Sequence, residues 1–189
     1  MDGDYYEKEG KNYDRITRIL DYFSPPGLVD WKIRVGKREA KRISTIALKI
    51  GTNVDEMVKA DVQGLKIPKA KSLEADNCFK AYLSWKKDYK LALYVPKTVF
   101  NEDLGVAGTP DLSPYEEILD IKCSSTIRES YWLQTEFYAR NCSEFGVVKY
   151  KSILRLDKDL AIYEYKRMPL NDTHYEVVCG LIKAYRYYN

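Results

Sequence analysis

Residues 105–125 read GVAGTPDLSPYEEILDIKCSS, and this stretch decides the fold. The segments Leu104 to Leu112 and Glu116 to Cys123 are rich in residues that favour strands. Between them, Ser113-Pro114-Tyr115 has the composition of a turn. The stretch therefore predicts two consecutive strands joined as a hairpin.

Charged residues stand at one end of this predicted hairpin. Side chains alternate across a strand, so Asp120 and Lys122 share one face while Leu119 and Ile121 point into the core. Asp111 ends the preceding strand and can lie beside them. Two carboxylates and one ammonium group thus converge at the edge of an apolar sheet, where charges are costly unless they are paired or bind a metal.

This trio has two interpretations. Carboxylate oxygens are hard ligands that suit Mg²⁺ or Mn²⁺, and the carbonyl oxygen of Ile121 would add another ligand to Asp111 and Asp120. Lys122 would then lie beside the metal-bound water. The alternative is a salt-bridged hairpin in which Asp111 caps the turn, because short patterns of this kind arise often by chance.

The next element, Arg128 to Ser143, predicts a helix with two distinct faces. Gln134 and Tyr138 are four residues apart and lie on one face, while Leu133 and Phe137 lie on the adjacent face and are typical of core. A polar flank on a core helix is the ordinary interpretation of Gln134 and Tyr138.

The rest of the chain predicts helices first and then strands alternating with helices. We expect residues 1–12 to be loosely attached. Periodicity predicts helices at 13–23, at 31–62 with a break at Gly51, and at 69–88, then strands and a last helix capped by Asn171, Asp172 or Thr173. The later strands are 91–100, 147–156 and 161–167. The order predicts an α/β (α+β) fold with a mixed central β-sheet flanked by helices.

Composition excludes several classes of protein. The 189 residues contain no apolar run of the roughly 20 residues that a membrane helix needs. The polar N-terminus is not a secretory signal, so we expect a cytoplasmic protein without a membrane partner. The cysteines, Cys78, Cys123, Cys142 and Cys179, are widely spaced and predict free buried thiols rather than zinc ligands or disulfides. His174 predicts a surface or capping histidine.

Basic residues gather between Trp31 and Lys49, where Glu39 is the single acid. Two pairs of like charges are four residues apart and repel each other on a helix: Lys37 with Lys41, and Arg38 with Arg42. The segment is either a solvated helix face or a face that follows a phosphate backbone.

The motifs together resemble the PD-(D/E)XK nuclease superfamily, in particular the RecB-like exonucleases of phages and archaeal viruses, which are related to the mitochondrial genome maintenance exonuclease. GVAGTPDL with EEILDIKCSS is similar to the second and third motifs of the family, and YWLQTEFYA to its Q-x-x-x-Y helix. KIGTNVDEMV resembles its G-T-x-V-H motif, while RITRILDYF, PPGLVDWKIRVG and SILRLDKD resemble flanking segments.

The resemblance covers nearly the whole chain from about residue 13 and implies its organisation. It implies a restriction-endonuclease-like core at residues 91–189, preceded by a helical region at 13–90 that lines the DNA path. It also implies a metal-dependent exonuclease acting from the ends of single-stranded or double-stranded DNA, in the host cytoplasm if the protein is viral. The alternatives are a DNA-binding protein that does not cut and an endonuclease for branched DNA.

The resemblance also assigns roles to residues. Asp111 and Asp120 would bind Mg²⁺ or Mn²⁺ with help from the carbonyl of Ile121, and Lys122 would be the catalytic lysine. Gln134 and Tyr138 would position the DNA backbone or support the site. The residues expected to contact nucleic acid are Thr17, Lys37, Arg38, Lys41 and Arg42.

Two positions depart from the family pattern. Family members place a metal-binding histidine where this chain has Asp55, so either Asp55 supplies an oxygen ligand or the neighbouring Glu56 does. Some relatives hold a [4Fe–4S] cluster with one early and three late cysteines. This chain has only Cys179 near its end, so we expect no iron–sulfur cluster.

Overall fold

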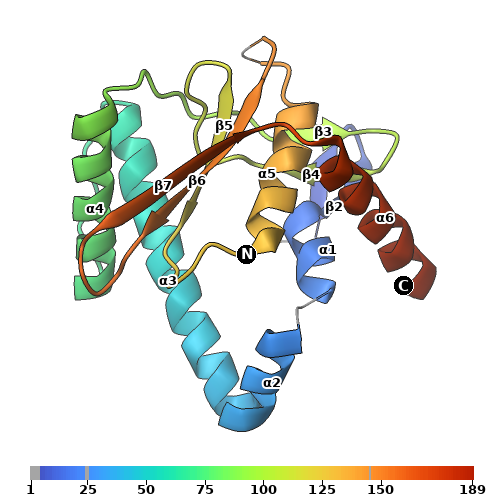
Figure 1. Ribbon diagram of the computed structural model, residues 1–189, viewed down its shortest axis with the longest axis horizontal. Helices are drawn as coiled ribbons and strands as arrows, with labels where there is room; N and C mark the ends of the chain where they lie inside the picture. The colour runs from blue at the N-terminus through green and yellow to red at the C-terminus, as the bar shows by residue number, and fades with distance from the viewer. Residues whose placement is uncertain (1–4, 24–25, 145) are drawn as a thin grey trace.

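The computed structural model describes residues 5–23, 26–144 and 146–189, and its helices and strands form a mixed α/β fold (Figure 1). The strands are β1 (Tyr5–Lys8), β2 (Lys11–Arg15), β3 (Val99–Asn101), β4 (Val106–Gly108), β5 (Glu117–Lys122), β6 (Tyr150–Leu156) and β7 (Tyr163–Pro169). The helices are α1 (Ile16–Tyr22), α2 (Pro26–Val35), α3 (Lys37–Val62), α4 (Leu73–Tyr89), α5 (Glu129–Asn141) and α6 (Asp172–Tyr188).

The strands form two sheets instead of the single central sheet that the sequence predicted. One sheet has the order β1-β2-β4-β3 and the other β5-β6-β7. Each sheet contains one parallel pair of strands, which is β2 and β4 in the first sheet and β5 and β6 in the second. The other neighbouring strands in both sheets are antiparallel. The strands predicted at 147–156 and 161–167 are present as β6 and β7, and they pair in antiparallel register.

The predicted hairpin around Ser113 is wrong in part. Strand β4 belongs to one sheet and β5 to the other, and the segment after β4 pairs with β5 at a single antiparallel bridge between Leu112 and Leu119. Pro110 and Pro114 lack backbone N–H groups, so a continuous ladder cannot form across this segment. The bridge nevertheless keeps Asp111 beside β5.

The N-terminal segment is also more ordered than predicted. Residues 5–12 were expected to be loosely attached, but they contribute to strands β1 and β2, which pair in antiparallel register. Glu9 and Gly10 form the connection with positive φ angles of 53° and 74°, as a two-residue hairpin turn requires. Tyr13 packs edge-on against Phe100 at a ring distance of 5.0 Å. Residues 1–4 lie outside the described part of the chain.

The two faces of the β5-β6-β7 sheet pack into different cores. Leu119 and Leu154 join α3 and α4 on one face, whereas Ile118 joins α1, α5 and α6 on the other. Because side chains alternate, Asp120 and Lys122 share the α5 side with Ile118. The predicted core helix is confirmed, since Leu133 and Phe137 of α5 are buried.

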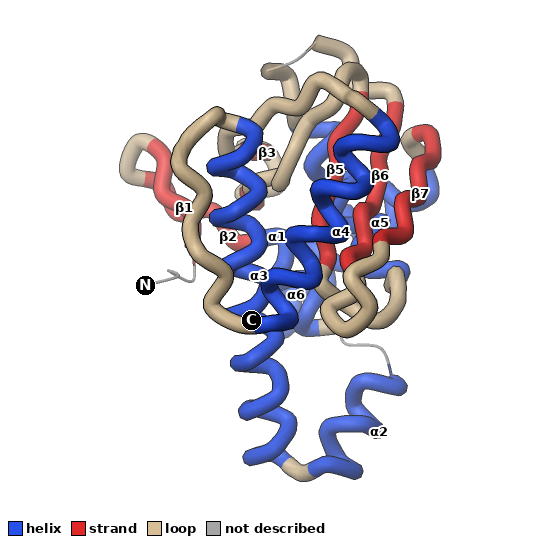
Figure 2. The backbone as a smooth tube through the Cα atoms, turned by 90° about the vertical axis from the view of Figure 1, so that its left-hand side faces the viewer, coloured by secondary structure: helices blue, strands red, loops and turns tan. Residues whose placement is uncertain are grey.

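Helix α2 and the first turns of α3 project from the body of the molecule; we call this segment, residues 26–46, the arm (Figure 2). The helix break predicted at Gly51 falls instead at Gly36, which has a φ of 82°. A residue without a side chain is needed for that conformation. Gly51 continues α3, because one glycine inside a long helix costs only about 1 kcal/mol.

Other boundaries moved less. The predicted strand 91–100 shortens to β3 with an isolated bridge at Tyr94, since Pro96 interrupts it. Helix α6 begins after Asn171, whose side chain accepts the amide of His174 as predicted for a cap. The His174 ring, however, contacts Lys151 and Glu129 and is 19% exposed, so it is not a surface side chain. None of the described helices is long and apolar enough to span a bilayer.

The cysteines follow the prediction in part. All four are free, and Cys78 and Cys142 are buried as expected. Cys123 and Cys179 are only half-buried, so the prediction of burial is wrong for these two.

Candidate active site

The three residues singled out by the sequence do converge, and backbone hydrogen bonding holds them together. Asp111 Oδ2 accepts the backbone amide of Ile121 at 2.7 Å, which ties the segment before the turn to strand β5. Lys122 Nζ lies 2.7 Å from Asp120 Oδ2. The Asp120 side chain is 1% exposed and that of Lys122 is 20% exposed, so the site is largely shielded from solvent.

Helix α5 completes the site through one glutamine. Gln134 Nε2 donates to Asp120 Oδ1 and to the Tyr138 hydroxyl, both at 3.0 Å, and Gln134 Oε1 accepts from Lys122 Nζ at 3.0 Å. One side chain therefore fixes the positions of Asp120, Lys122 and Tyr138. The predicted grouping of Gln134 and Tyr138 with the acidic residues is present in the fold, because β5 packs directly against α5.

Burial governs the protonation of these groups. Desolvation first, and the negative charge of Asp120 second, raise the pKa of Asp111 from 3.8 to about 7. Desolvation also raises the pKa of Asp120, although Lys122 opposes that change. For Lys122, desolvation lowers the pKa, but the charges of Asp120 and Asp111 outweigh it and raise the pKa overall. The ammonium group stays protonated while the carboxyl groups resist ionisation.

These residues open onto a pocket of about 440 Å³ that α3, β5 and α5 enclose. Its lining combines both parts of the chain that the sequence distinguished: Asp55 and its neighbours on α3 come from the helical region, and the acidic pair with Lys122 and Gln134 comes from the later part. The residues that matter for its chemistry are Gly51, Asp55, Asp111, Asp120, Lys122 and Gln134.

The oxygen donors of this pocket suit a hard divalent cation. Asp111 and Asp120 are two desolvated carboxyl groups that share one ammonium group, that of Lys122, which lies 2.7 Å from Asp120 Oδ2. When both carboxyl groups are ionised, one ammonium group leaves a negative charge in a buried site, which is costly unless a further cation binds there. Asp111 and Asp120 therefore fit a metal ion, with the Ile121 segment at the pocket wall.

The third ligand predicted from the sequence is not assembled. The Asp55 carboxylate lines the pocket but forms an ion pair with Lys59 at 2.9 Å, one turn along α3. Glu56, the alternative, pairs with Lys71 at 3.0 Å. Within residues 5–23, 26–144 and 146–189, no three His, Cys, Asp or Glu side chains are grouped closely enough to hold a metal ion. Asp55 would have to leave Lys59 to join Asp111 and Asp120.

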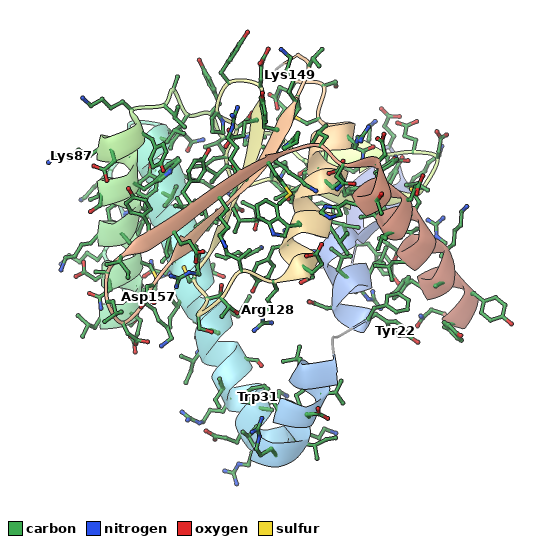
Figure 3. The ribbon with its side chains drawn as sticks, viewed as in Figure 1. Tyr22, Trp31, Lys87, Arg128, Lys149 and Asp157 are labelled. Atoms are coloured by element: carbon green, nitrogen blue, oxygen red, sulfur yellow. The ribbon has the colours of Figure 1, made fainter. Side chains whose placement is uncertain are left out.

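The residues predicted to contact nucleic acid lie away from this pocket. Lys37, Arg38, Lys41 and Arg42 are exposed on the arm, and Thr17 is half-buried on α1. Arg42 is engaged by Glu39 at 2.7 Å. The side-chain view shows Arg128 on the body, on the side that faces the arm carrying Trp31 (Figure 3).

Sequence reasoning missed Tyr131, which lines the pocket. Lys122 Nζ lies 4.9 Å from the centroid of the Tyr131 ring, within the range of a cation–π contact. Tyr131 precedes Gln134 by three residues on α5, so the helical period that placed Gln134 and Tyr138 on one face would also have found it. Cys123 lines the same pocket and packs near Cys78.

Solved structures, among them two of an alkaline exonuclease, share this fold. An alkaline exonuclease from Laribacter hongkongensis, LHK-Exo, superposes with a TM-score of 0.54 and 11% identity, covering 93% of this chain and 86% of its own. LHK-Exo in complex with dAMP gives a TM-score of 0.53 at 11% identity and the same coverage. A structure named SSO0001 gives 0.51 at 11% identity, covering 98% of this chain and 79% of its own.

The comparisons confirm the predicted fold class, a mixed α/β fold. No protein-family model matches the sequence, and no curated protein matches it.

Proposed function

We propose that this chain is a metal-dependent exonuclease that hydrolyses phosphodiester bonds in DNA. The observation that carries the proposal is the pair of desolvated carboxyl groups, Asp111 and Asp120, that share one ammonium group, with Lys122 Nζ 2.7 Å from Asp120 Oδ2. The fold that it shares with LHK-Exo, an alkaline exonuclease, supports the nuclease part of the proposal. The resemblance of residues 105–125 and 131–139 to the nuclease motifs points to the same residues.

Asp111 and Asp120 would hold Mg²⁺ or Mn²⁺, and Asp55 would join them once it separates from Lys59. A bound cation of this kind lowers the pKa of a coordinated water and neutralises charge on the phosphate. Desolvation raises the pKa of both buried carboxyl groups, and for Asp111 the charge of Asp120 adds to that rise. A divalent cation would reverse that penalty and favour both ionised forms.

The remaining residues act on the substrate and on each other. The protonated Lys122 would stabilise the negative charge that develops on the phosphate and orient the attacking water. Gln134 holds Lys122 and Asp120 through its two ends, so it is a positioning residue. Tyr138 hydrogen-bonds Gln134 from the far side and fixes its orientation.

The enzyme would act at the ends of DNA. The Q-x-x-x-Y helix supports this mode, because it favours end trimming in the RecB-like family that the sequence resembles. The structure of LHK-Exo in complex with a mononucleotide, dAMP, supports it as well. The test compares linear and covalently closed circular DNA of one sequence, with Mg²⁺ or Mn²⁺ and with EDTA. Linear DNA should release mononucleotides while the circle stays intact. Equal cutting of both forms would refute the end-acting mode, and metal-independent binding without cutting would favour a DNA-binding role.

A further inference from the structure

One face of α3 runs without interruption from the arm to the candidate active site. Residues separated alternately by four and three positions lie on one side of a helix. Six accessible residues of α3 follow that spacing, and we call them the α3 stripe: Lys37, Lys41, Ser44, Leu48, Gly51 and Asp55. The first three line a pocket on the arm, and the last three line the active-site pocket.

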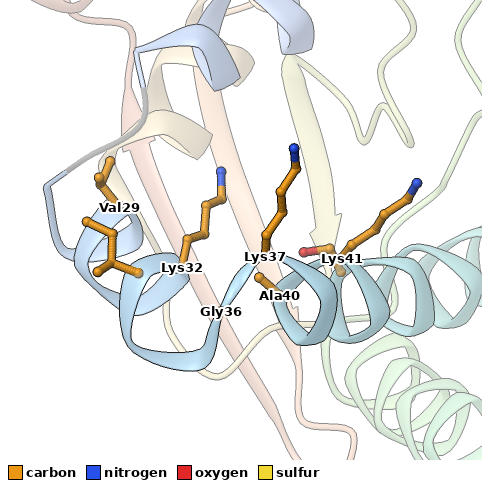
Figure 4. A pocket seen from close by; sticks show the side chains of 8 residues that line it. Val29, Lys32, Gly36, Lys37, Ala40 and Lys41 are labelled. Carbon is orange, nitrogen blue, oxygen red and sulfur yellow. The ribbon is translucent and has the colours of Figure 1, made fainter.

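The arm pocket is basic along one edge. Lys32 of α2 and Lys37 and Lys41 of α3 extend their ammonium groups in the same direction (Figure 4). Within the described part of the chain, none of the three forms an ion pair, whereas the neighbouring Arg42 is neutralised by Glu39. Three ammonium groups that point the same way and form no ion pair fit a chain of phosphates.

Apolar side chains are interleaved with these lysines. Ile33 and Val29 line the arm pocket and are 75% and 43% exposed, and Leu48 on the stripe is 62% exposed. Duplex DNA presents its phosphates to such a surface and keeps its base faces stacked. A single strand offers unstacked bases to apolar side chains and phosphates to lysines, as in other grooves for single strands.

Asp21 interacts electrostatically with a lysine of each of the two pockets. Asp21, near the end of α1, has a pKa raised by desolvation, and the positive charges of Lys122 in the site and Lys32 in the arm both oppose that rise. One carboxyl group thus senses a lysine from each pocket.

We propose that the α3 stripe is the path along which a single strand of DNA runs from the arm pocket to the active-site pocket. The inference rests on the proposed function and names its substrate form. From Lys37 to Asp55 the path is about 27 Å long at about 1.5 Å per residue. At about 3.4 Å per nucleotide it holds about eight nucleotides, and fewer if the strand is stretched. Arg38 and Arg42, about 100° farther round the helix, lie off this path.

The test measures binding of fluorescent oligothymidylate to the full chain in EDTA, so that no cleavage is required. Lys37→Ala with Lys41→Ala should lower the affinity at least tenfold and reduce the slope of log affinity against log salt by about 1.4, because each lost phosphate contact on a single strand contributes about 0.7. The matched pair Arg38→Ala with Arg42→Ala removes the same charge from the same helix and should change the affinity less than about twofold.

Two further measurements make the outcome decisive. Lys37→Arg with Lys41→Arg keeps the charge and should keep the affinity. Wild-type affinity should rise with oligonucleotide length and level off at about eight nucleotides, and a duplex of equal length should bind more weakly. Equal losses from the lysine and arginine pairs, or a duplex that binds as tightly, would overturn the inference. Binding with this pattern but without any metal-dependent cleavage would refute the proposed function alone.

Discussion

Gln134 on α5 and Asp120 on β5 are joined by a hydrogen bond of 3.0 Å inside the protein, where Asp120 is 1% exposed. The same glutamine accepts from Lys122, so one neutral side chain keeps an acid and a base in their relative positions. Local sequence separates these residues by 14 positions, and only the packing of β5 against α5 unites them.

Gln134→Ala tests this relationship. The change leaves buried partners unsatisfied, so the free energy of unfolding should fall by about 1–3 kcal/mol. The concentration of Mn²⁺ needed for half-maximal cleavage should rise about 10–100-fold, the usual effect of losing a residue that orients a metal ligand. Urea unfolding and a metal titration measure the two effects. Gln63→Ala, at an exposed position, is the control; if Gln134→Ala behaves like it, the positioning role is wrong.

Gly108→Ala tests how closely the site is packed from behind. A Cβ at residue 108 would lie 2.4 Å from Tyr138 Cε1 and 2.9 Å from Ile16 Cγ2, so the buried tyrosine must move. Overpacking of this kind costs about 1–3 kcal/mol. The rate of DNA cleavage should fall as well, because the displaced Tyr138 would no longer hold Gln134 in place.

Gly180→Ala provides the comparison for that variant. Gly180 lies within α6, and a methyl group added there would meet nothing within 4 Å, so alanine should be neutral or stabilise by up to about 1 kcal/mol. Thermal unfolding of both variants measures the contrast. A Gly108→Ala protein with wild-type stability would show that the site is looser than described.

Asp111→Asn should stabilise the metal-free protein while it abolishes activity. The pKa of Asp111 is raised from 3.8 to about 7, so ionisation above that range destabilises the fold. This penalty is absent when the pH is below the pKa of Asp111 in the unfolded chain. It is complete when the pH is above the pKa of Asp111 in the folded protein. Asparagine removes it and can still accept the amide of Ile121.

Urea unfolding in EDTA should therefore show the Asp111→Asn protein to be more stable than the wild type at about pH 8, by on the order of 1 kcal/mol or more. The difference should shrink steadily as the pH falls from about 7 towards about 4. A variant that is less stable than the wild type at every pH would mean that Asp111 is a structural cap rather than a strained metal ligand.

Lys151→Met tests a buried ion pair outside the active site. Lys151 Nζ lies 2.6 Å from Glu136 Oε2, and both side chains are fully buried. Removing one partner of such a pair costs about 3–5 kcal/mol. Lys80→Met removes a lysine from an exposed pair with Asp76 and should cost less than about 1 kcal/mol. Similar Tm values for the two variants would contradict the importance of this pair.

Local periodicity was sufficient for the central part of the site. The two-residue repeat of a strand placed Asp120 and Lys122 on one face, and the helical repeat placed Gln134 beside Tyr138. Both are properties of a few consecutive residues, and the fold preserves them. The same reasoning also identified the core residues Leu133 and Phe137.

Features that depend on tertiary contacts were not accessible in this way. The ion pair between Asp55 and Lys59 competes with any metal, and residue type alone does not reveal which partner holds Asp55. The division of the strands into two sheets depends on how the chain between β4 and β5 is bridged. The helix break at Gly36 was missed because Gly51 is the same residue type inside the same helical stretch, and only the positive φ of Gly36 distinguishes them.

The metal-dependent hydrolysis of a single phosphodiester bond tests the central claim most directly. Release of labelled nucleotide from linear single-stranded DNA should be measured for the wild type, Asp120→Asn and Lys122→Met, with Mn²⁺ and with EDTA, after circular dichroism shows that each variant is folded. The wild type should release nucleotide only with Mn²⁺, and each variant should be slower by a factor of about 100 or more. Release in EDTA, or variants as fast as the wild type, would contradict the assignment of Asp120 and Lys122 as the catalytic pair.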